Sequence, residues 1–134
     1  IVAALGSMAI YLVHLARFDE AVVRAREALE LARNRQWEAK TARSLQLLAA
    51  VAALRPRPDA GQTAKSRALA ARILGFSDAC NEAIGLQRFP NTDPQYDRII
   101  SALRESLRAD AVAKLMAAGA TMTEEQAVEA ASKI

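Results

Sequence analysis

The sequence predicts an all-α domain of stacked helical hairpins, closed at its C-terminal end by about three further helices. Three observations favour this fold class. Apolar residues recur with the 3.6-residue period of an α-helix, and no segment shows the two-residue alternation of a strand. The composition is 52% apolar but only 4% aromatic, which is typical of closely packed helices with small side chains. Proline, glycine and capping residues divide the 134 residues into helix-sized segments.

The first half of the chain contains three expected helices. The first covers about 2–15 and ends at the tight turn "ARF", after which Asp19 and Glu20 suit the positive N-terminus of a second helix that runs to about 34. The third covers about 37–54. The apolar face of the first helix, which we expect to be buried, carries Val2, Leu5, Met8, Ala9 and Leu12.

The second helix carries small residues where larger ones would bury more area. Alanine stands at positions 21, 25, 28 and 32, on spacings of four, three and four. Small side chains let neighbouring backbones approach closely, so this stripe predicts a helix that lies between two others. Gly75 costs about 1 kcal/mol relative to Ala inside a helix, and it predicts a second close crossing, with the helix that follows Pro94 as the expected partner.

Proline, glycine and capping residues indicate where the remaining helices begin and end. Pro56 and Pro58 end the third helix, and a fourth covers about 60–84 with Gly85 in the left-handed position after it. After a loop at 86–92, Asp93 and Pro94 begin a fifth helix. A sixth spans about 109–118 and is expected to end at Gly119, and Thr123 with Gln126 forms a capping box for a last helix at about 123–133. The apolar stripe of the fifth helix is Tyr96, Ile99, Ile100, Leu103 and Leu107.

The chain also shows an internal repeat. A shift of 43 residues superposes the alanines at 21, 25 and 28 on those at 64, 68 and 71, and it superposes the apolar positions 2, 5, 8 and 9 on 45, 48, 51 and 52. The match fails at Leu12, which meets Arg55, and at Phe18, which meets Gly61. A duplicated helical hairpin explains both halves of the coincidence.

The segment "AALGSMAIYL…ARFDEA…AREALELA" from Ala3 to Ala32 resembles a tetratricopeptide repeat, a hairpin that stacks into an α-α superhelix. The matching positions are Met8, Ala9, Leu12, Phe18, Ala21, Ala25 and Ala28. It departs from the pattern at Leu5, where Trp is common, at Ala16, where Gly is usual, and at Arg33, where Pro often ends the repeat. The spacing of 43 residues is also longer than the usual one.

The second half is similar to the C-terminal end of bacterial predicted-ATPase regulators of the STAND type. The resemblance rests on "ARILG" at 71–75, Tyr96-Asp97-Arg98, and Gly119-Ala120 before Thr123-x-Glu125-x-Ala127. It implies one helical-repeat domain over 1–134 within a longer chain, with repeat-like helix pairs at 1–54 and 60–84 and capping helices at 93–134. The implied function is a non-catalytic protein-interaction or regulatory module of a bacterial transcription regulator or signalling ATPase.

The residues that carry chemistry are few. No phosphate-binding "GxxxxGK[ST]" occurs, and one histidine, His14, with one cysteine, Cys80, supplies neither a zinc site nor a nucleophile–base pair. Acidic Asp78 and Glu82 beside Cys80 are expected to raise its pKa. We therefore expect no enzyme activity, no catalytic residue, no cofactor and no metal in this region. Glu124 and Glu125 are explained by their favourable interaction with the helix dipole. We expect the aromatic residues Trp37, Phe76 and Phe89 in the core or in an interface.

The expected partners are proteins, either other domains of the same polypeptide or a second copy of the chain. The tetratricopeptide register places Ile10, Val13 and His14 toward the concave groove, which makes them the candidate partner-binding residues. Two alternatives stay open: a small-molecule effector pocket, or nucleic-acid binding through residues 17–72, where twelve Lys/Arg stand against six Asp/Glu. We favour the protein partner because no basic cluster is interleaved with aromatic residues.

No membrane contact is expected, because the longest uncharged apolar run, "IVAALGSMAIYLV", is shorter than a bilayer-spanning helix. A single cysteine and the lack of a secretory leader pattern favour the cytoplasm.

Overall fold

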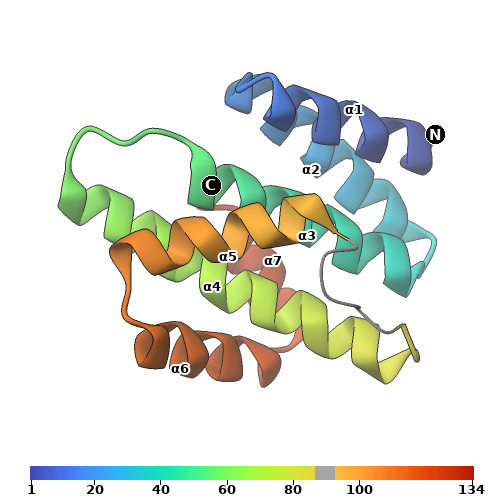
Figure 1. Cartoon of the computed structure of the whole chain (residues 1–134). Helices are drawn as coiled ribbons and strands as arrows, with labels where there is room; N and C mark the ends of the chain where they lie inside the picture. The colour runs from blue at the N-terminus through green and yellow to red at the C-terminus, as the bar shows by residue number, and fades with distance from the viewer. Residues whose placement is uncertain (87–92) are drawn as a thin grey trace.

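A computed structural model describes residues 1–86 and 93–134 of the chain, and the described residues are all-helical, with no strand. Consecutive helices reverse direction, so that α1 and α2, and then α3 and α4, lie side by side (Figure 1). The helices are α1 (Val2–His14), α2 (Phe18–Asn34), α3 (Glu38–Leu54), α4 (Ala60–Ala83), α5 (Pro94–Ser106), α6 (Ala109–Ala120) and α7 (Glu124–Ala131).

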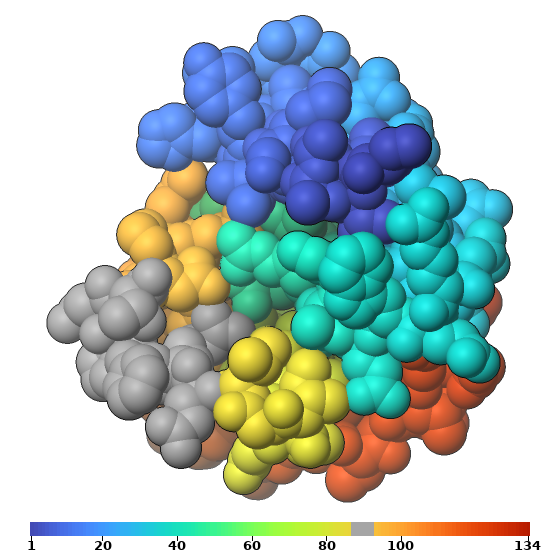
Figure 2. Space-filling view, turned by 90° about the vertical axis from the view of Figure 1, so that its right-hand side faces the viewer, coloured from blue at the N-terminus to red at the C-terminus, as the bar shows by residue number. Residues whose placement is uncertain are grey.

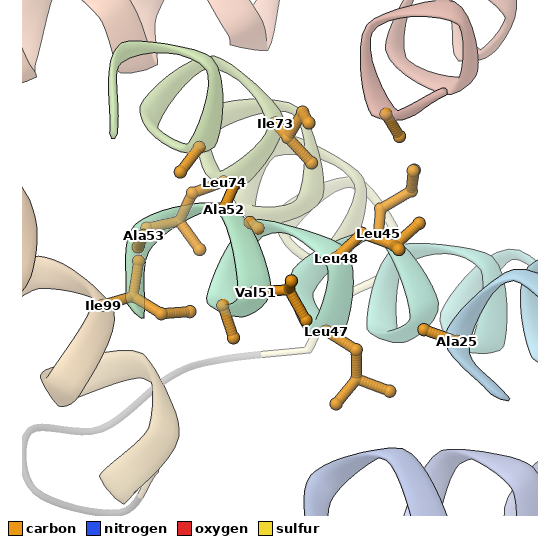
Figure 3. Close-up of a cluster of buried hydrophobic side chains, with 14 of the residues drawn as sticks. Ala25, Leu45, Leu47, Leu48, Val51, Ala52, Ala53, Ile73, Leu74 and Ile99 are labelled. Atoms are coloured by element: carbon orange, nitrogen blue, oxygen red, sulfur yellow. The ribbon is translucent and has the colours of Figure 1, made fainter. Parts of the chain in front are cut away.

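Helix α3 forms the centre of the molecule and is buried on all sides from residue 44 to 53. The segment 44–54 contains no charged residue, which is the pattern of a helix that is surrounded by others. Helices α1, α2, α4, α5 and α7 all pack against it. Figure 3 shows its side chains pointing in several directions, with Leu47 toward α1, Ala53 toward Ile99 of α5, and Leu48 beside Leu45 on another side.

Three connections share one local geometry, in which a helix ends on a residue with positive φ. Ala16 has φ 58°, Gln36 has φ 52° and Gly85 has φ 80°. In each case the next amide donates to a carbonyl five residues back: Arg17 to Leu12 O at 2.8 Å, Trp37 to Ala32 O at 2.8 Å, and Leu86 to Asn81 O at 2.8 Å. These are Schellman caps. The prediction of a left-handed Gly85 is confirmed, and Ala16 and Gln36 adopt the same conformation although glycine is preferred there.

The α3–α4 hairpin is held by side-chain hydrogen bonds to backbone carbonyls. The Ser77 hydroxyl donates to Ala42 O at 2.9 Å, and the Ser66 hydroxyl donates to Ala52 O at 2.7 Å. The two bonds fix antiparallel helices, because 42 pairs with 77 and 52 with 66. The predicted break at Pro56 and Pro58 is confirmed, and Asp59 caps α4 by accepting from Gln62 N at 2.8 Å.

Helices α4 and α6 cross at a pair of glycines. A Cβ placed on Gly75 would lie 2.0 Å from the carbonyl oxygen of Met116, and one on Gly119 would lie 1.8 Å from that of Arg72. The predicted close crossing at Gly75 is therefore confirmed, but its partner is α6 and not α5. The prediction that Gly119 ends the sixth helix is wrong, since α6 continues to Ala120 and Gly119 is needed for contact rather than for termination.

Helix α5 begins as predicted at Asp93 and Pro94, with Tyr96 N donating to Asp93 Oδ1 at 3.1 Å. The buried Gln46 side chain of α3 donates from Nε2 to Asp93 Oδ2 at 3.1 Å. The Tyr96 hydroxyl donates to Asp78 Oδ2 of α4 at 2.7 Å. Ile99 and Leu103 of the predicted stripe are fully buried. Helix α5 is thus bonded to both helices of the second hairpin.

The last three helices do not stack at one end of the molecule but lie on different sides of α4. Helix α5 covers α3 and α4, α6 runs along α4, and α7 packs against α3 and α4. The capping box of Thr123 and Gln126 is present. Helix α7 also reaches α2, because Arg33 Nε lies 3.2 Å from Glu124 Oε2 and Arg26 Nη2 donates to Ser132 O at 3.3 Å.

The alanine stripe of α2 is fully buried, as predicted, at 21, 25, 28 and 32. In α4, Ala71 is buried, while Ala64 and Ala68 are half-buried. The helices of the two hairpins begin 36 residues apart (α1 and α3) and 42 residues apart (α2 and α4), rather than 43. The prediction that Met8 lies on the buried face of α1 is wrong, because that face is centred on Val2, Ala9 and Val13 and leaves 48% of Met8 exposed.

Candidate functional site

The three residues expected in a partner groove have different surroundings. Ile10 is half-buried and packs against the core, Val13 is only 2% exposed, and His14 is exposed. Val13 therefore offers no side-chain surface to a partner, because it faces into the molecule. A groove contact through Ile10 and His14 stays a prediction.

The largest apolar surface of α1 lies on a different face. Ile1 is 82% exposed, Met8 48%, Tyr11 64% and Leu15 46%. With the exposed Ala4, these residues follow spacings of three, four, three and four, so they form one stripe along the helix, which we name the α1 outer face. In Figure 2, α1 (dark blue) faces the viewer along the upper part of the molecule, and no other segment lies over it in this view.

The α1 outer face differs from an ordinary solvated helix surface. Residues 1–16 contain no Asp, Glu, Lys or Arg, so no charged side chain interrupts or borders the stripe from α1 itself. Exposed single apolar residues are common on proteins, but a continuous stripe marks an interaction site. The sequence indicates this exposed stripe, because a helix without charged residues has more apolar positions than a single buried face can hold.

The equivalent face of α3 is covered. Offsets of 36 and 43 residues differ by seven, or two helical turns, so both pair the same faces of α1 and α3. At an offset of 43, positions 1, 4 and 8 correspond to Ser44, Leu47 and Val51, and all three are buried. Leu47 points toward α1 (Figure 3). The second hairpin thus has a helix over the face that the first hairpin leaves open.

Cys80 is half-buried on α4, and burial raises the pKa of its thiol, with smaller contributions from Glu124 and Glu38. The direction agrees with the prediction, but the acidic neighbours belong to α7 and α3 and are not Asp78 and Glu82. A raised pKa lowers the thiolate fraction and with it the nucleophilicity. Among the described residues, no group of three His, Cys, Asp or Glu side chains is arranged to hold a metal ion.

The aromatic residues have different environments. Phe76 is buried in the core at 7% exposure, as expected. Trp37 is 44% exposed, and Lys40 Nζ lies 5.6 Å from its ring centroid, so it is a surface residue with a cation–π contact. Phe89 lies outside the described residues.

Several cations of residues 17–72 lie in ion pairs with carboxylates. Arg17 pairs with Glu20, Arg24 with Glu27, and Arg33 with Glu124, so several of the charges that suggested a nucleic-acid surface are neutralised locally. Arg43 and Arg67 also pair, with Asp93 and Glu105.

Helices in the described parts of the chain are all too short or too polar to cross a lipid bilayer. Comparison of the chain with protein-family models, with curated proteins and with solved structures gives no significant match. The candidate site is therefore identified from the structure alone, and it is the α1 outer face.

Proposed function

We propose that this chain is a non-catalytic helical-repeat module, related to tetratricopeptide hairpins, that binds a helical hairpin of a protein partner on the α1 outer face. One observation supports the proposal. Helix α1 covers one face of α3, and the equivalent face of α1 is exposed. In a helical-repeat protein each hairpin packs only on its neighbours, so an uncovered face of this kind is the place where the next hairpin docks.

The chemistry of the occupant follows from the face. Met8, Tyr11 and Leu15 require an apolar stripe with the spacing of a helix, and the absence of charge on α1 gives no basis for an ionic partner. Tyr11 is 64% exposed and combines a large apolar surface with a hydroxyl, which suits the centre of an interface.

The wider setting of the proposal is a regulatory domain of a larger cytoplasmic protein in bacteria, a transcription regulator or a signalling ATPase. It is supported by the resemblance of residues 68–88 and 96–131 to the ends of such proteins. The coding sequence upstream of Ile1 tests the setting. We expect further helical hairpins there, and before them a phosphate-binding "GxxxxGK[ST]" motif.

The docking face is tested with a tandem protein in which residues 1–37 are repeated ahead of Ile1. If the added hairpin docks on α1, each interface adds to stability, so the melting temperature rises above that of the single chain. Met8 of the receiving helix becomes covered, and its oxidation by peroxide, followed by peptide mass spectrometry, slows. The matched control carries Tyr11→Lys and Leu15→Lys in the receiving helix, and we expect neither change in it.

Two outcomes overturn the proposal. One is a tandem protein with the melting temperature and the Met8 oxidation rate of the single chain. The other is a single chain that sediments as a dimer and becomes monomeric with Tyr11→Lys, because a second copy would then be the occupant of the α1 outer face.

A further inference from the structure

A hollow of about 580 Å³ lies where the α3–α4 connection meets the end of α7, and its wall is strongly basic. Five of its lining side chains are cations from separate parts of the chain, and among the described residues no Asp or Glu side chain lines it. In Figure 1 the C-terminus lies beside the end of α3, and Lys133 lines the hollow together with Arg55 and Arg57 of the α3–α4 connection. The five cations are Arg55, Arg57, Lys65, Arg72 and Lys133.

Four of the five cations have no partner in the described part of the chain: Arg57, Lys65, Arg72 and Lys133 make no ion pair and no side-chain hydrogen bond there. Elsewhere on the molecule, arginines such as Arg24 and Arg33 pair with carboxylates. Four unpaired cations therefore line one hollow.

The fifth cation, Arg55, is only weakly neutralised. Its Nη2 lies 4.0 Å from Oδ1 of Asp19, whose side chain is 99% exposed, and an ion pair of this kind contributes little. Its Nε is buried and has no hydrogen-bond partner among the described residues. A buried donor without an acceptor is costly, and an acceptor supplied at this wall would remove the cost.

The nearest acidic side chain in the sequence is already engaged. Asp59 accepts from Gln62 N at 2.8 Å through Oδ1 and from Gln62 Nε2 at 3.2 Å through Oδ2, as the N-cap of α4. Its carboxylate is held at the end of the helix and does not line the hollow.

We propose that this hollow binds a small molecule that carries two or more phosphate groups. Its volume lies within the range of about 300–1,000 Å³ that is typical of small-molecule sites. A concave wall of one charge sign focuses the field on a bound anion, and arginine forks match phosphate oxygens. Ala52, Leu69 and Ile134 add an apolar part to the wall, which suits an organic group attached to the phosphates.

A second hollow of about 600 Å³ between α2 and α7 provides a contrast. Its wall holds Arg26 and Arg33 but also Glu30 and Glu124, so its charges balance and it offers no excess attraction for an anion. A nucleic acid would be favoured by cations along an open stripe. The cations here surround a hollow, which favours a small ligand.

Inorganic triphosphate is the probe for the test, with affinity measured by titration calorimetry on the full chain at low salt. We expect saturable binding at one site, which weakens by at least about tenfold in the double variant Lys65→Gln and Arg72→Gln. The matched control, Arg104→Gln with Lys114→Gln, removes two exposed cations away from the hollow, and we expect its affinity to stay within about twofold of the parent. A second double variant, Arg57→Gln with Lys133→Gln, is expected to cause a similar loss, because it removes two other lining cations.

Three results would overturn the inference. These are no triphosphate binding at low salt, an equal loss of affinity in the hollow and control variants, and tighter binding of a short single- or double-stranded oligonucleotide than of triphosphate. The α1 outer face contributes no residue to this hollow, so the inference stands or falls independently of the proposed docking of a helical hairpin.

Discussion

Gly75 of α4 and Gly119 of α6 form a reciprocal contact, in which each glycine lies against the carbonyl of the residue three positions before the other. Gly75 meets Met116 O and Gly119 meets Arg72 O, and neither site has room for a Cβ. The two helices thus approach at their backbones, in the geometry of Cα–H···O contacts. The pair fixes α6 on α4, because any side chain at either position would force the helices apart.

Substitution of either glycine by alanine is expected to destabilise the fold. Gly75→Ala and Gly119→Ala should each lower the free energy of unfolding by about 3 kcal/mol, since a methyl group must displace backbone rather than a side chain. The double variant should cost less than the sum, because the first change already separates the helices. Urea denaturation measures all three. Gly6→Ala is the control, because nothing lies within 4 Å of its Cβ, and it should stabilise by up to about 1 kcal/mol.

Ala16→Gly and Gln36→Gly should both increase stability. The native residues hold φ values of 58° and 52°, a conformation that costs an L-residue about 1–2 kcal/mol and glycine little. We expect a gain of about 1 kcal/mol for each in urea denaturation. Ala113→Gly on the exposed side of α6 should instead lower the free energy of unfolding, because glycine is unfavourable inside a helix. If all three variants lost stability, the left-handed caps would be wrong.

Two positions on α1 distinguish its buried face from its outer face. Val13→Ala should cost about 2 kcal/mol, because Val13 is 2% exposed and leaves a cavity in the core. Met8→Ala should change stability by less than about 0.5 kcal/mol, since Met8 is 48% exposed. Thermal or urea unfolding compares them. Equal effects would contradict the orientation of α1.

Tyr96→Phe tests the bond that ties α5 to α4. Removing the hydroxyl that donates to Asp78 Oδ2 at 2.7 Å should cost about 1 kcal/mol in the free energy of unfolding. Tyr11→Phe provides the matched control, because Tyr11 is on the α1 outer face and makes no side-chain hydrogen bond in the described residues. A Tyr96→Phe protein as stable as the control would show that this bond contributes nothing.

Cys80 should react slowly with thiol reagents in the folded protein. Its pKa is raised, so at pH 7.5 or so the thiolate fraction is below that of a free cysteine with a pKa of about 8.5. The unfolded chain loses the thiol proton at a lower pH than the folded one. The Cys80 contribution to stability is therefore full below about pH 8.5 and falls as the pH rises through the folded-state pKa. Cys80→Ser removes this pH dependence, and a disulfide-exchange rate equal to that of the unfolded chain would contradict the raised pKa.

The sequence by itself determined which segments are helices and where most of them begin and end. Local chemistry decides these points: Asp93 and Thr123 cap helices through their own side chains, Pro56 and Pro58 cannot continue one, and Gly85 takes a left-handed conformation. The burial of the alanine stripe of α2 could also be predicted from the sequence, because the alanines recur with the period of the helix.

Only the tertiary structure decided which helix meets which, and so which apolar residues stay exposed. Periodicity identifies an apolar stripe but not its partner, and this is why Gly75 was assigned to α5 instead of α6, and why Met8 was placed in the core and Val13 in a groove. On α1 apolar residues occupy more than one face, and the packing of α2 and α3 selects the face with Val13. The basic hollow depends on the same kind of information, because the path of α7 across the second hairpin brings Lys133 to the hollow that Arg55 also lines.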